Sequence, residues 1–200
     1  MLEYESRLWA SGYKYVAGVD EAGRGPLAGP VYAAAVIFAE GTVIEGINDS
    51  KKLTEKKREQ LFDVIIEKAL AYKIVSVDEK EIDRINILNA SLKAFSLAVD
   101  GLSTKAEYVL FDGNRAPKDM TIPFETVVKG DAKVQAIAAA SILAKVARDR
   151  YITEMDKVYP QYGFAGHKGY PTKEHKEAVA LHGPSPIHRL TFRGVSEHVK

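Results

Sequence analysis

Four carboxylates of this sequence stand where secondary-structure elements are expected to end. Asp20 and Glu21 follow one apolar, strand-like stretch, Asp112 follows another, and Asp131 stands between the last expected strand and a long helix. Strand ends at one edge of an α/β sheet converge on a crevice, which is where such folds bind ligands. Grouped carboxylates without histidine or cysteine nearby favour Mg²⁺ or Mn²⁺ over zinc. Two such ions about 4 Å apart would suit hydrolysis of a phosphodiester, because they hold both the attacking water and the leaving oxygen.

Each acid also has an ordinary structural explanation. Asp112-Gly113-Asn114 could form a turn, and Asp131 could cap the helix after it, which would stabilise that helix by about 1 kcal/mol. Asp20-Glu21 is harder to explain in this way, because two adjacent charges after an apolar strand are costly to bury unpaired. Adjacent residues of a regular strand point to opposite faces. We therefore expect the strand to break at Glu21, so that both carboxylates can serve one site.

The turn Gly23-Arg24-Gly25 directly follows the acidic pair. It lacks the third glycine of the dinucleotide-binding fingerprint and the Gly-Lys-Ser/Thr of a phosphate loop. A simple tight turn explains the motif equally well in isolation. Its position beside two carboxylates suggests in addition that exposed backbone amides and carbonyls could approach a sugar–phosphate closely.

The elements that would position these residues alternate in type. Apolar stretches predict strands at 15–19, 31–38, 43–46, 72–77, 108–111 and 124–128. Helical spacing and capping residues predict helices at 54–68, 85–99, 131–158 and 172–181. This order predicts an α/β fold with a mixed sheet flanked by helices and a helical C-terminal extension. We expect the catalytic domain to span residues 1–158, and residues 159–200 to complete the substrate-binding face.

Composition limits the setting of the protein. The chain has 200 residues, 46% of them hydrophobic, and no cysteine, which excludes disulfides and cysteine nucleophiles. The absence of cysteine fits a reducing compartment. The N-terminus does not resemble a secretory signal, and no stretch reaches the roughly 18 apolar residues of a membrane span. We expect a cytoplasmic protein that makes no membrane contact, and a monomer.

Positive charge is unevenly distributed, although the formal net charge is only +1. One basic cluster lies at Lys51–Arg58, and basic residues outnumber acidic ones after Tyr159. Two basic patches could bind a polyanion on one face, but ordinary solvated surface charge explains them about as well. Ser50, Lys51 and Lys145 are the weaker candidates for phosphate contacts, which would add affinity without sequence preference.

The residues around the acids resemble a known family. The run Val19-Asp20-Glu21-Ala22-Gly23-Arg24-Gly25-Pro26-Leu27-Ala28-Gly29-Pro30-Val31 closely resembles the opening motif of bacterial ribonuclease HII, the type 2 ribonuclease H. Six further stretches look like family motifs in family order: 49–53 (DSKKL), 112–114 (DGN), 129–131 (KGD), 139–149 (AASILAKVARD), 166–170 (GHKGY) and 188–192 (HRLTF). Together the matches span about residues 13 to 193.

The resemblance implies a ribonuclease H-like fold and an endoribonuclease. Such an enzyme hydrolyses the phosphodiester 5′ of ribonucleotides in RNA–DNA hybrids, and of single ribonucleotides in duplex DNA, leaving a 3′-hydroxyl and a 5′-phosphate. The family's metal-binding carboxylates map onto Asp20, Glu21, Asp112 and Asp131. Its ribose-reading backbone maps onto Gly23, Arg24 and Gly25, and the tyrosine that packs on the neighbouring deoxyribose maps onto Tyr170. The 2′-hydroxyl is the group that distinguishes RNA from DNA at a site.

Two other functions would also suit clustered acids. Another nuclease with the ribonuclease H fold, such as a resolvase or exonuclease, would cut all-DNA substrates. A non-catalytic nucleic-acid-binding module would keep its whole function after Asp112→Asn. The ribonuclease HII hypothesis predicts neglect of DNA that lacks a ribonucleotide, so the choice of substrate separates the two nucleases. It also predicts that Asp112→Asn abolishes cleavage while largely sparing the fold and binding, which separates it from the binding module.

Overall fold

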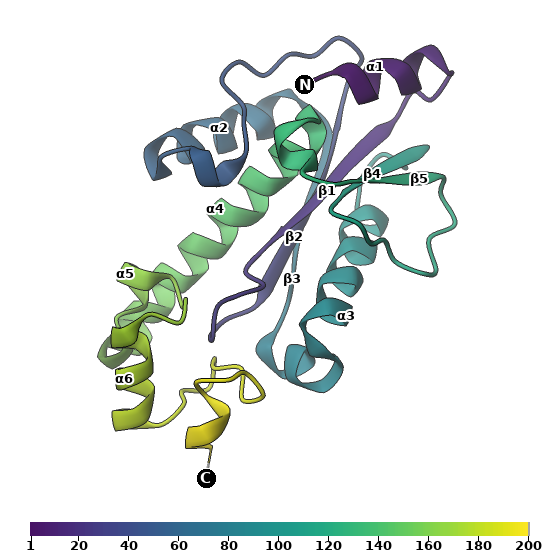
Figure 1. Ribbon diagram of the computed structural model, residues 1–200. Coiled ribbons are helices and arrows are strands. Elements are labelled where there is room, and N and C mark those ends of the chain that lie inside the picture. The colour runs from purple at the N-terminus through teal and green to yellow at the C-terminus, as the bar shows by residue number, and fades with distance from the viewer. Residues whose placement is uncertain (200) are drawn as a thin grey trace.

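The computed structural model describes residues 1–199 as a mixed sheet flanked by helices (Figure 1). The strand order is β3-β2-β1-β4-β5, with β1 antiparallel to β2, β2 antiparallel to β3, and β1, β4 and β5 mutually parallel. The strands are β1 (Val16–Ala22), β2 (Val31–Phe38), β3 (Ala69–Val77), β4 (Tyr108–Asp112) and β5 (Phe124–Val127). This confirms the predicted α/β class and mixed sheet.

The structure contains six α-helices within residues 1–199. They are α1 (Glu3–Ala10), α2 (Glu55–Lys68), α3 (Glu79–Asp100), α4 (Gln135–Val158), α5 (Phe164–His167) and α6 (Lys173–His182). Side-chain caps explain three of the starts, because Thr54, Asp78 and Thr172 each accept a hydrogen bond from a backbone N–H in the first turn. Helices α1 and α5 were not predicted from the sequence.

The predicted strand at 43–46 is wrong. Val43 is exposed, and the buried Ile44 donates its backbone N–H to Oε1 of Gln135 at 2.9 Å. The Gln135 amide nitrogen in turn donates to the carbonyl of Thr42 at 2.9 Å. One side-chain amide thus satisfies backbone groups that a neighbouring strand would otherwise pair with, and the segment stays irregular.

Both faces of the sheet are covered, which explains the nearly continuous apolar run of β2. Ala33, Ala35 and Ile37 belong to a core shared with α3, whereas Ala34 and Val36 belong to a second core shared with α2 and α4. Figure 1 shows the same division, with α3 on one side of the sheet and α2 and α4 on the other. A strand buried on both faces cannot alternate apolar and polar residues.

Helix α4 lies unusually close to β1. A methyl group built on Gly18 would lie 2.2 Å from the backbone carbonyl carbon of Ala136. This is too close for any side chain, so only glycine fits at this position. The alanines 136, 138, 139, 140 and 144 of α4 are all buried. Small residues on both elements therefore set the spacing between the helix and the strand that carries Asp20.

Residues 159–199 pack on the far end of α4 and return to the loop after β1. Tyr162, Phe164 and Val179 form an apolar cluster with Ala28 and Ile152. Three backbone hydrogen bonds join the two parts: Leu27 to Gly169, Gly29 to Ile187 and Arg189 to Leu27. The expected helical extension is thus present, while the domain boundary at residue 158 remains a prediction. None of the helices within residues 1–199 has the length and apolar character that a membrane span needs.

Candidate active site

Parallel pairing of β1 and β4 brings the first three acids to one edge of the sheet. Val19 pairs with Phe111, so Asp20 and Asp112 follow as neighbours at the carboxyl ends of adjacent strands. β5 runs parallel to β4, and the turn after it, Gly130–Ala132, carries Asp131. The predicted convergence of strand ends therefore occurs.

The expected break of β1 at Glu21 is wrong. The strand continues to Ala22, and Glu21 stays in register with Ala33 of β2. Pairing with β4, however, ends at Val19, which leaves the other edge of Asp20 and Glu21 open. Because that edge is free, a side chain from either face can reach the cleft, and both acids line it. The end of the pairing with β4 therefore lets both acids serve one site, which a break in β1 was expected to do.

Asp131 does not cap α4. The helix begins at Gln135, and its Ala136 N–H donates to Oε1 of the buried Glu5 from α1 at 3.0 Å. Glu5 therefore supplies the capping interaction that was the alternative explanation for Asp131. Asp131 instead belongs to a short 3₁₀ turn in which Asp112 Oδ1 accepts the Gly130 N–H at 2.7 Å. This bond ties the turn to the end of β4.

Mutual repulsion and burial make the cleft unfavourable for bare carboxylates. Burial, followed by the charges of Glu21 and Asp112, raises the pKa of Asp20 well above its ordinary value. Burial likewise raises the pKa of Glu21 and of Asp131, and the Asp112 charge adds to both effects. Arg24 partly offsets this, because its Nη1 lies 3.3 Å from Oε1 of Glu21. A cation bound among these acids would relieve the repulsion and favour their charged forms.

The acids line a cleft of about 250 Å³ together with the glycine-rich turn. Its lining includes Asp20, Glu21, Ala22, Gly23, Arg24, Gly25, Ser50, Lys51, Asp112, Asp131, Ser141, Lys145 and Tyr170. A larger cavity of about 880 Å³ lies between the start of α3 and the C-terminal segment, and it contains none of these residues. The acids and the glycine-rich turn therefore lie in the smaller of these two cavities.

Tyr170 lies directly against the glycine-rich turn. A methyl group built on Gly25 would be 3.6 Å from Cε1 of the Tyr170 ring, and Tyr170 as a residue is 40% exposed. Lys145 Nζ lies 5.9 Å from the centre of the same ring and 2.8 Å from Oδ1 of Asp149. The two predicted substrate-binding motifs, which are far apart in the sequence, therefore form one wall of the cleft.

The remaining candidates differ in accessibility. Lys51 is exposed at the rim, whereas Ser50 is buried with its hydroxyl 2.9 Å from that of Ser141. Ser141 also forms a side-chain hydrogen bond that lowers the pKa of Asp20. The sequence reasoning missed Ser141 as a site residue, although it stands within one of the recognised motifs. Its position on α4, facing the strand that carries Asp20, is not visible from spacing alone.

The donor chemistry of the cleft suits a hard divalent cation. Four carboxylates supply only oxygen ligands, which Mg²⁺ and Mn²⁺ prefer. As the side chains stand, no three Asp, Glu or His groups within residues 1–199 are set closely enough to enclose an ion. The raised pKa of Asp20 nevertheless marks a site where a bound cation would relieve repulsion.

Comparison with known proteins identifies sequence relatives along almost the whole chain. The family described as Ribonuclease HII matches residues 17–195. A relative from Acetivibrio thermocellus, named Ribonuclease HII, is 57% identical over 192 residues, which cover 96% of this chain and 75% of that protein.

Solved structures share the fold. The ribonuclease H2 of Pyrococcus horikoshii OT3 superposes with a TM-score of 0.77 at 32% identity, covering 92% of this chain and 96% of that one. The structure described as Bst-RNase HIII in complex with Mn²⁺ superposes with a TM-score of 0.69 at 16% identity, covering 92% of this chain and 68% of that one. At that identity the second similarity shows the fold alone.

Proposed function

The chain belongs to the ribonuclease HII family, and from that membership we propose an endonuclease specific for ribonucleotides. It cleaves RNA–DNA hybrids and also the phosphodiester 5′ of a single ribonucleotide embedded in duplex DNA. The products carry a 3′-hydroxyl and a 5′-phosphate. Mg²⁺ or Mn²⁺ serves as the cofactor, held by Asp20, Glu21, Asp112 and Asp131.

One observation carries the proposal. The acidic edge of the sheet, the Gly23–Gly25 turn and the Tyr170 ring line the same small cleft. Carboxylates alone would suit any metal-dependent nuclease. The adjoining turn adds backbone groups that can bind a sugar hydroxyl, and the exposed ring offers an apolar face for the next sugar. This combination favours a nuclease whose cleavage depends on recognition of the sugar.

Each group of residues then has its own task. Divalent ions, when bound, would activate water and stabilise the charge that develops on the phosphate. Backbone groups of Gly23, Arg24 and Gly25 bind the 2′-hydroxyl, and Tyr170 packs on the neighbouring deoxyribose. Lys51 and Lys145 contact backbone phosphates without reading sequence. Ser50 contributes indirectly, because its hydroxyl is directed toward Ser141 inside the cleft wall.

The test is incubation with a labelled duplex that contains one ribonucleotide, beside an all-DNA duplex of identical sequence. With Mg²⁺ or Mn²⁺ we expect a single cut 5′ of the ribonucleotide, no cut in the control, and no cut with EDTA. Cleavage of both duplexes would instead favour a DNA nuclease of the same fold. Failure to cut the ribonucleotide-containing duplex in either metal would refute the proposal.

Asp112→Asn separates catalysis from binding. The amide keeps the shape and the Oδ1 that accepts from Gly130, so we expect the fold and duplex affinity to persist. Cleavage should fall by roughly 100-fold or more, as for loss of one electrostatic stabiliser of a transition state. Unchanged cleavage would instead show that Asp112 is not a ligand.

The setting of the enzyme remains part of the proposal. A chain without cysteine suits a reducing compartment, and we propose a cytoplasmic monomer. Sedimentation at several protein concentrations tests the oligomeric state. Self-association in that experiment would contradict the proposal of a monomer.

A further inference from the structure

A fully buried guanidinium lies beneath the glycine-rich turn. Arg189 has no exposed surface, and no ion pair within residues 1–199 includes it. Its Nε donates to the carbonyl of Gly29 at 2.9 Å, Nη1 to that of Arg24 at 3.0 Å, and Nη2 to that of Gly23 at 2.6 Å. A buried cation without an acidic partner is unfavourable, so its presence calls for an explanation beyond packing.

These bonds fix the orientation of two peptide groups. A trans peptide is planar, so its C=O and N–H point in opposite directions. The carbonyl of Gly23 shares a plane with the Arg24 N–H, and the carbonyl of Arg24 shares a plane with the Gly25 N–H. Because Arg189 holds both carbonyls inward, both N–H groups point away from it. Neither has a hydrogen-bond acceptor in the described part of the chain, and both residues line the acidic cleft.

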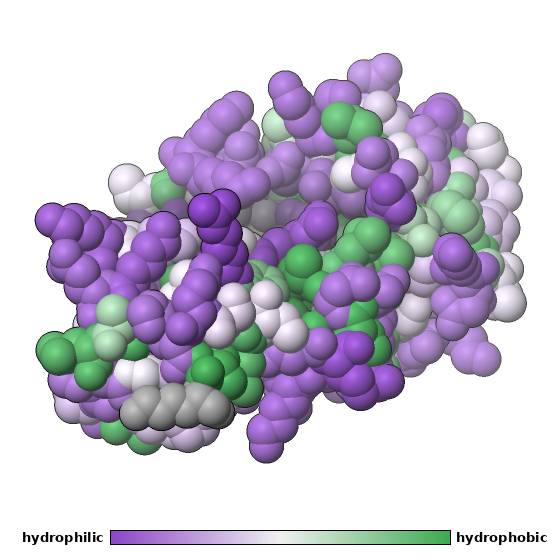
Figure 2. All heavy atoms as spheres, turned by 60° about the horizontal axis from the view of Figure 1, so that its bottom comes forward, coloured by the Kyte–Doolittle hydropathy of each residue, from purple (hydrophilic) through white to green (hydrophobic). Residues whose placement is uncertain are grey.

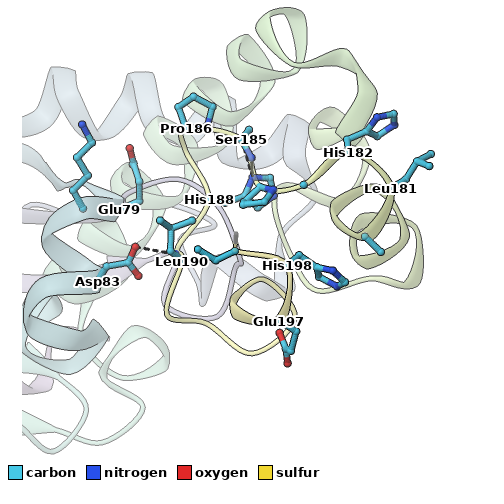
Figure 3. Close-up of a pocket in the computed structure, with 15 residues that line it drawn as sticks. Glu79, Asp83, Leu181, His182, Ser185, Pro186, His188, Leu190, Glu197 and His198 are labelled. Carbon is cyan, nitrogen blue, oxygen red and sulfur yellow. Dashed lines mark hydrogen bonds between the residues drawn. The ribbon is translucent and has the colours of Figure 1, made fainter.

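The segment that carries Arg189 is itself held on both sides. The Arg189 N–H donates to the Leu27 carbonyl at 2.8 Å. On one side, His188 Nδ1 accepts the Ser185 N–H at 2.9 Å. On the other, Asp83 of α3 accepts the backbone N–H of Leu190 at 2.8 Å and that of Thr191 at 3.0 Å. Figure 3 shows the hydrogen bond between Asp83 and Leu190, which both line the large cavity, and His188 beside Ser185.

Arg189 lies wholly beneath the surface of this end of the molecule. Figure 2, which brings this end forward, shows that surface as mostly hydrophilic side chains with hydrophobic patches among them. Phe192 closes over the guanidinium, with the Arg189 Cζ 5.0 Å from the centre of its ring. A planar fork with five N–H donors can bond three carbonyls at once. A lysine at this position has the charge but not the geometry.

We propose that Arg189 is the positioning residue for ribose recognition, because it directs the Arg24 and Gly25 N–H groups toward the sugar of the bound ribonucleotide. This inference rests on the proposed function of the cleft. It predicts that loss of the guanidinium weakens discrimination between ribose and deoxyribose, and leaves binding of plain duplex DNA unchanged. A residue that only stabilises the fold would weaken both kinds of binding together.

The experiment measures binding, not cleavage. Fluorescence anisotropy in EDTA gives Kd for a duplex with one ribonucleotide and for the all-DNA duplex, and their ratio measures ribose selectivity. For Arg189→Lys we expect the selectivity ratio to fall by about tenfold, the equivalent of one well-aligned hydrogen bond. Affinity for all-DNA should stay within a factor of about two, because phosphate contacts do not involve the turn.

Two further variants keep the test decisive. Val179→Ala removes buried packing from the same C-terminal region without touching the turn, so its ratio should match wild type even if its Tm falls. Asp83→Ala frees Leu190 and Thr191 without burying a charge, and it should lower the ratio if Arg189→Lys does not fold. An unchanged selectivity ratio in Arg189→Lys overturns the proposal. If Arg189→Lys does not fold, an unchanged ratio in Asp83→Ala overturns it instead. An equal fall of the ratio in Val179→Ala also overturns it. Wild type with equal Kd for the two duplexes would also overturn this inference, whereas only failure to cut the ribonucleotide-containing duplex in Mg²⁺ or Mn²⁺ would overturn the proposed function itself.

Discussion

At the scale of single residues, Asp20 is unfavourable for folding, and the metal-binding role proposed for it explains why an acid stands there. Its side chain is only 5% exposed, at an edge where Glu21 and Asp112 add negative charge. The protein keeps this carboxylate although nothing in the fold requires its charge. Functional sites commonly hold residues that reduce stability in this way.

Asp20→Asn should therefore stabilise the metal-free protein while abolishing cleavage. We expect an increase of roughly 1 kcal/mol in the free energy of unfolding, typical of relieving strain at a functional site. Thermal melts in EDTA and in Mg²⁺ test this. Wild type should gain stability from Mg²⁺, and the variant should gain much less. A variant less stable than wild type in EDTA would contradict the electrostatic argument.

The two glycines of the turn differ in the reason for their presence. Gly23 has φ of +95°, and a methyl group there would lie 2.2 Å from Nε of the buried Arg148. At Gly25 the backbone is unstrained, and a methyl group meets only the Tyr170 ring at ordinary contact distance. The fold thus requires glycine at position 23, whereas only a closely approaching substrate requires it at position 25.

Gly25→Ala should preserve Tm within about 1 °C but lower affinity for the ribonucleotide-containing duplex, because the methyl group occupies the space where the sugar would lie. Gly23→Ala should lower stability by roughly 1–3 kcal/mol through overpacking and backbone strain. Paired thermal melts and anisotropy titrations distinguish the two effects. Equal losses of stability would show that both glycines serve the fold.

At the scale of elements, the strands that hold the acids could be predicted because their apolar runs end abruptly at Asp20 and Asp112. What could not be predicted depends on partners distant in sequence. Gln135 replaces a strand beside Ile44, and Glu5 caps α4 in place of Asp131. The open edge of β1 beyond Val19 depends on where β4 ends, a matter of register between strands. The periodicity of apolar residues describes one segment at a time, so it cannot show which distant side chain will pair with that segment.

Gly18→Ala tests how closely α4 must approach β1. The added methyl group would collide with the Ala136 backbone, which cannot yield as a flexible side chain would. We expect a loss of about 3 kcal/mol or failure to fold, at the upper end of overpacking effects. Gly166→Ala is the matched control, since a methyl group there meets nothing within 4 Å. Urea denaturation of both variants gives the comparison.

At the scale of the whole molecule, buried histidines join the C-terminal segment to the wall of the cleft that contains Tyr170. His188 Nδ1 accepts from Ser185, so its Nε2 carries the hydrogen and donates to Nε2 of His175 at 3.0 Å. His175 Nδ1 then donates to the Tyr170 carbonyl at 2.9 Å. Protonating either ring would set two N–H groups against each other. Burial, the larger effect, lowers the pKa of His175 to about 4 and that of His188 to about 3.

These shifts predict acid sensitivity. Below the unfolded histidine pKa of about 6.5 the unfolded chain binds protons that the folded chain does not, so stability present above pH 6.5 falls as pH falls toward 4. Between pH 7 and pH 5 the loss is roughly 2 kcal/mol for each histidine. Urea denaturation at both pH values should show a smaller loss in His188→Asn. His182→Asn, at an exposed site, should behave as wild type does, and an equal reduction there would refute the assignment.

The contacts of Arg189 have a consequence for the order in which the molecule is completed. The ribosome makes the turn at residues 23–25 long before it makes the arginine that orients this turn, because the two are separated by more than 160 residues. A chain that has emerged only as far as α4 already contains all four acids, yet it lacks the two hydrogen bonds from Arg189 to the turn. If Arg189 sets ribose selectivity as proposed, a chain that ends at residue 187 should bind the two duplexes with a smaller difference in Kd than the full chain does.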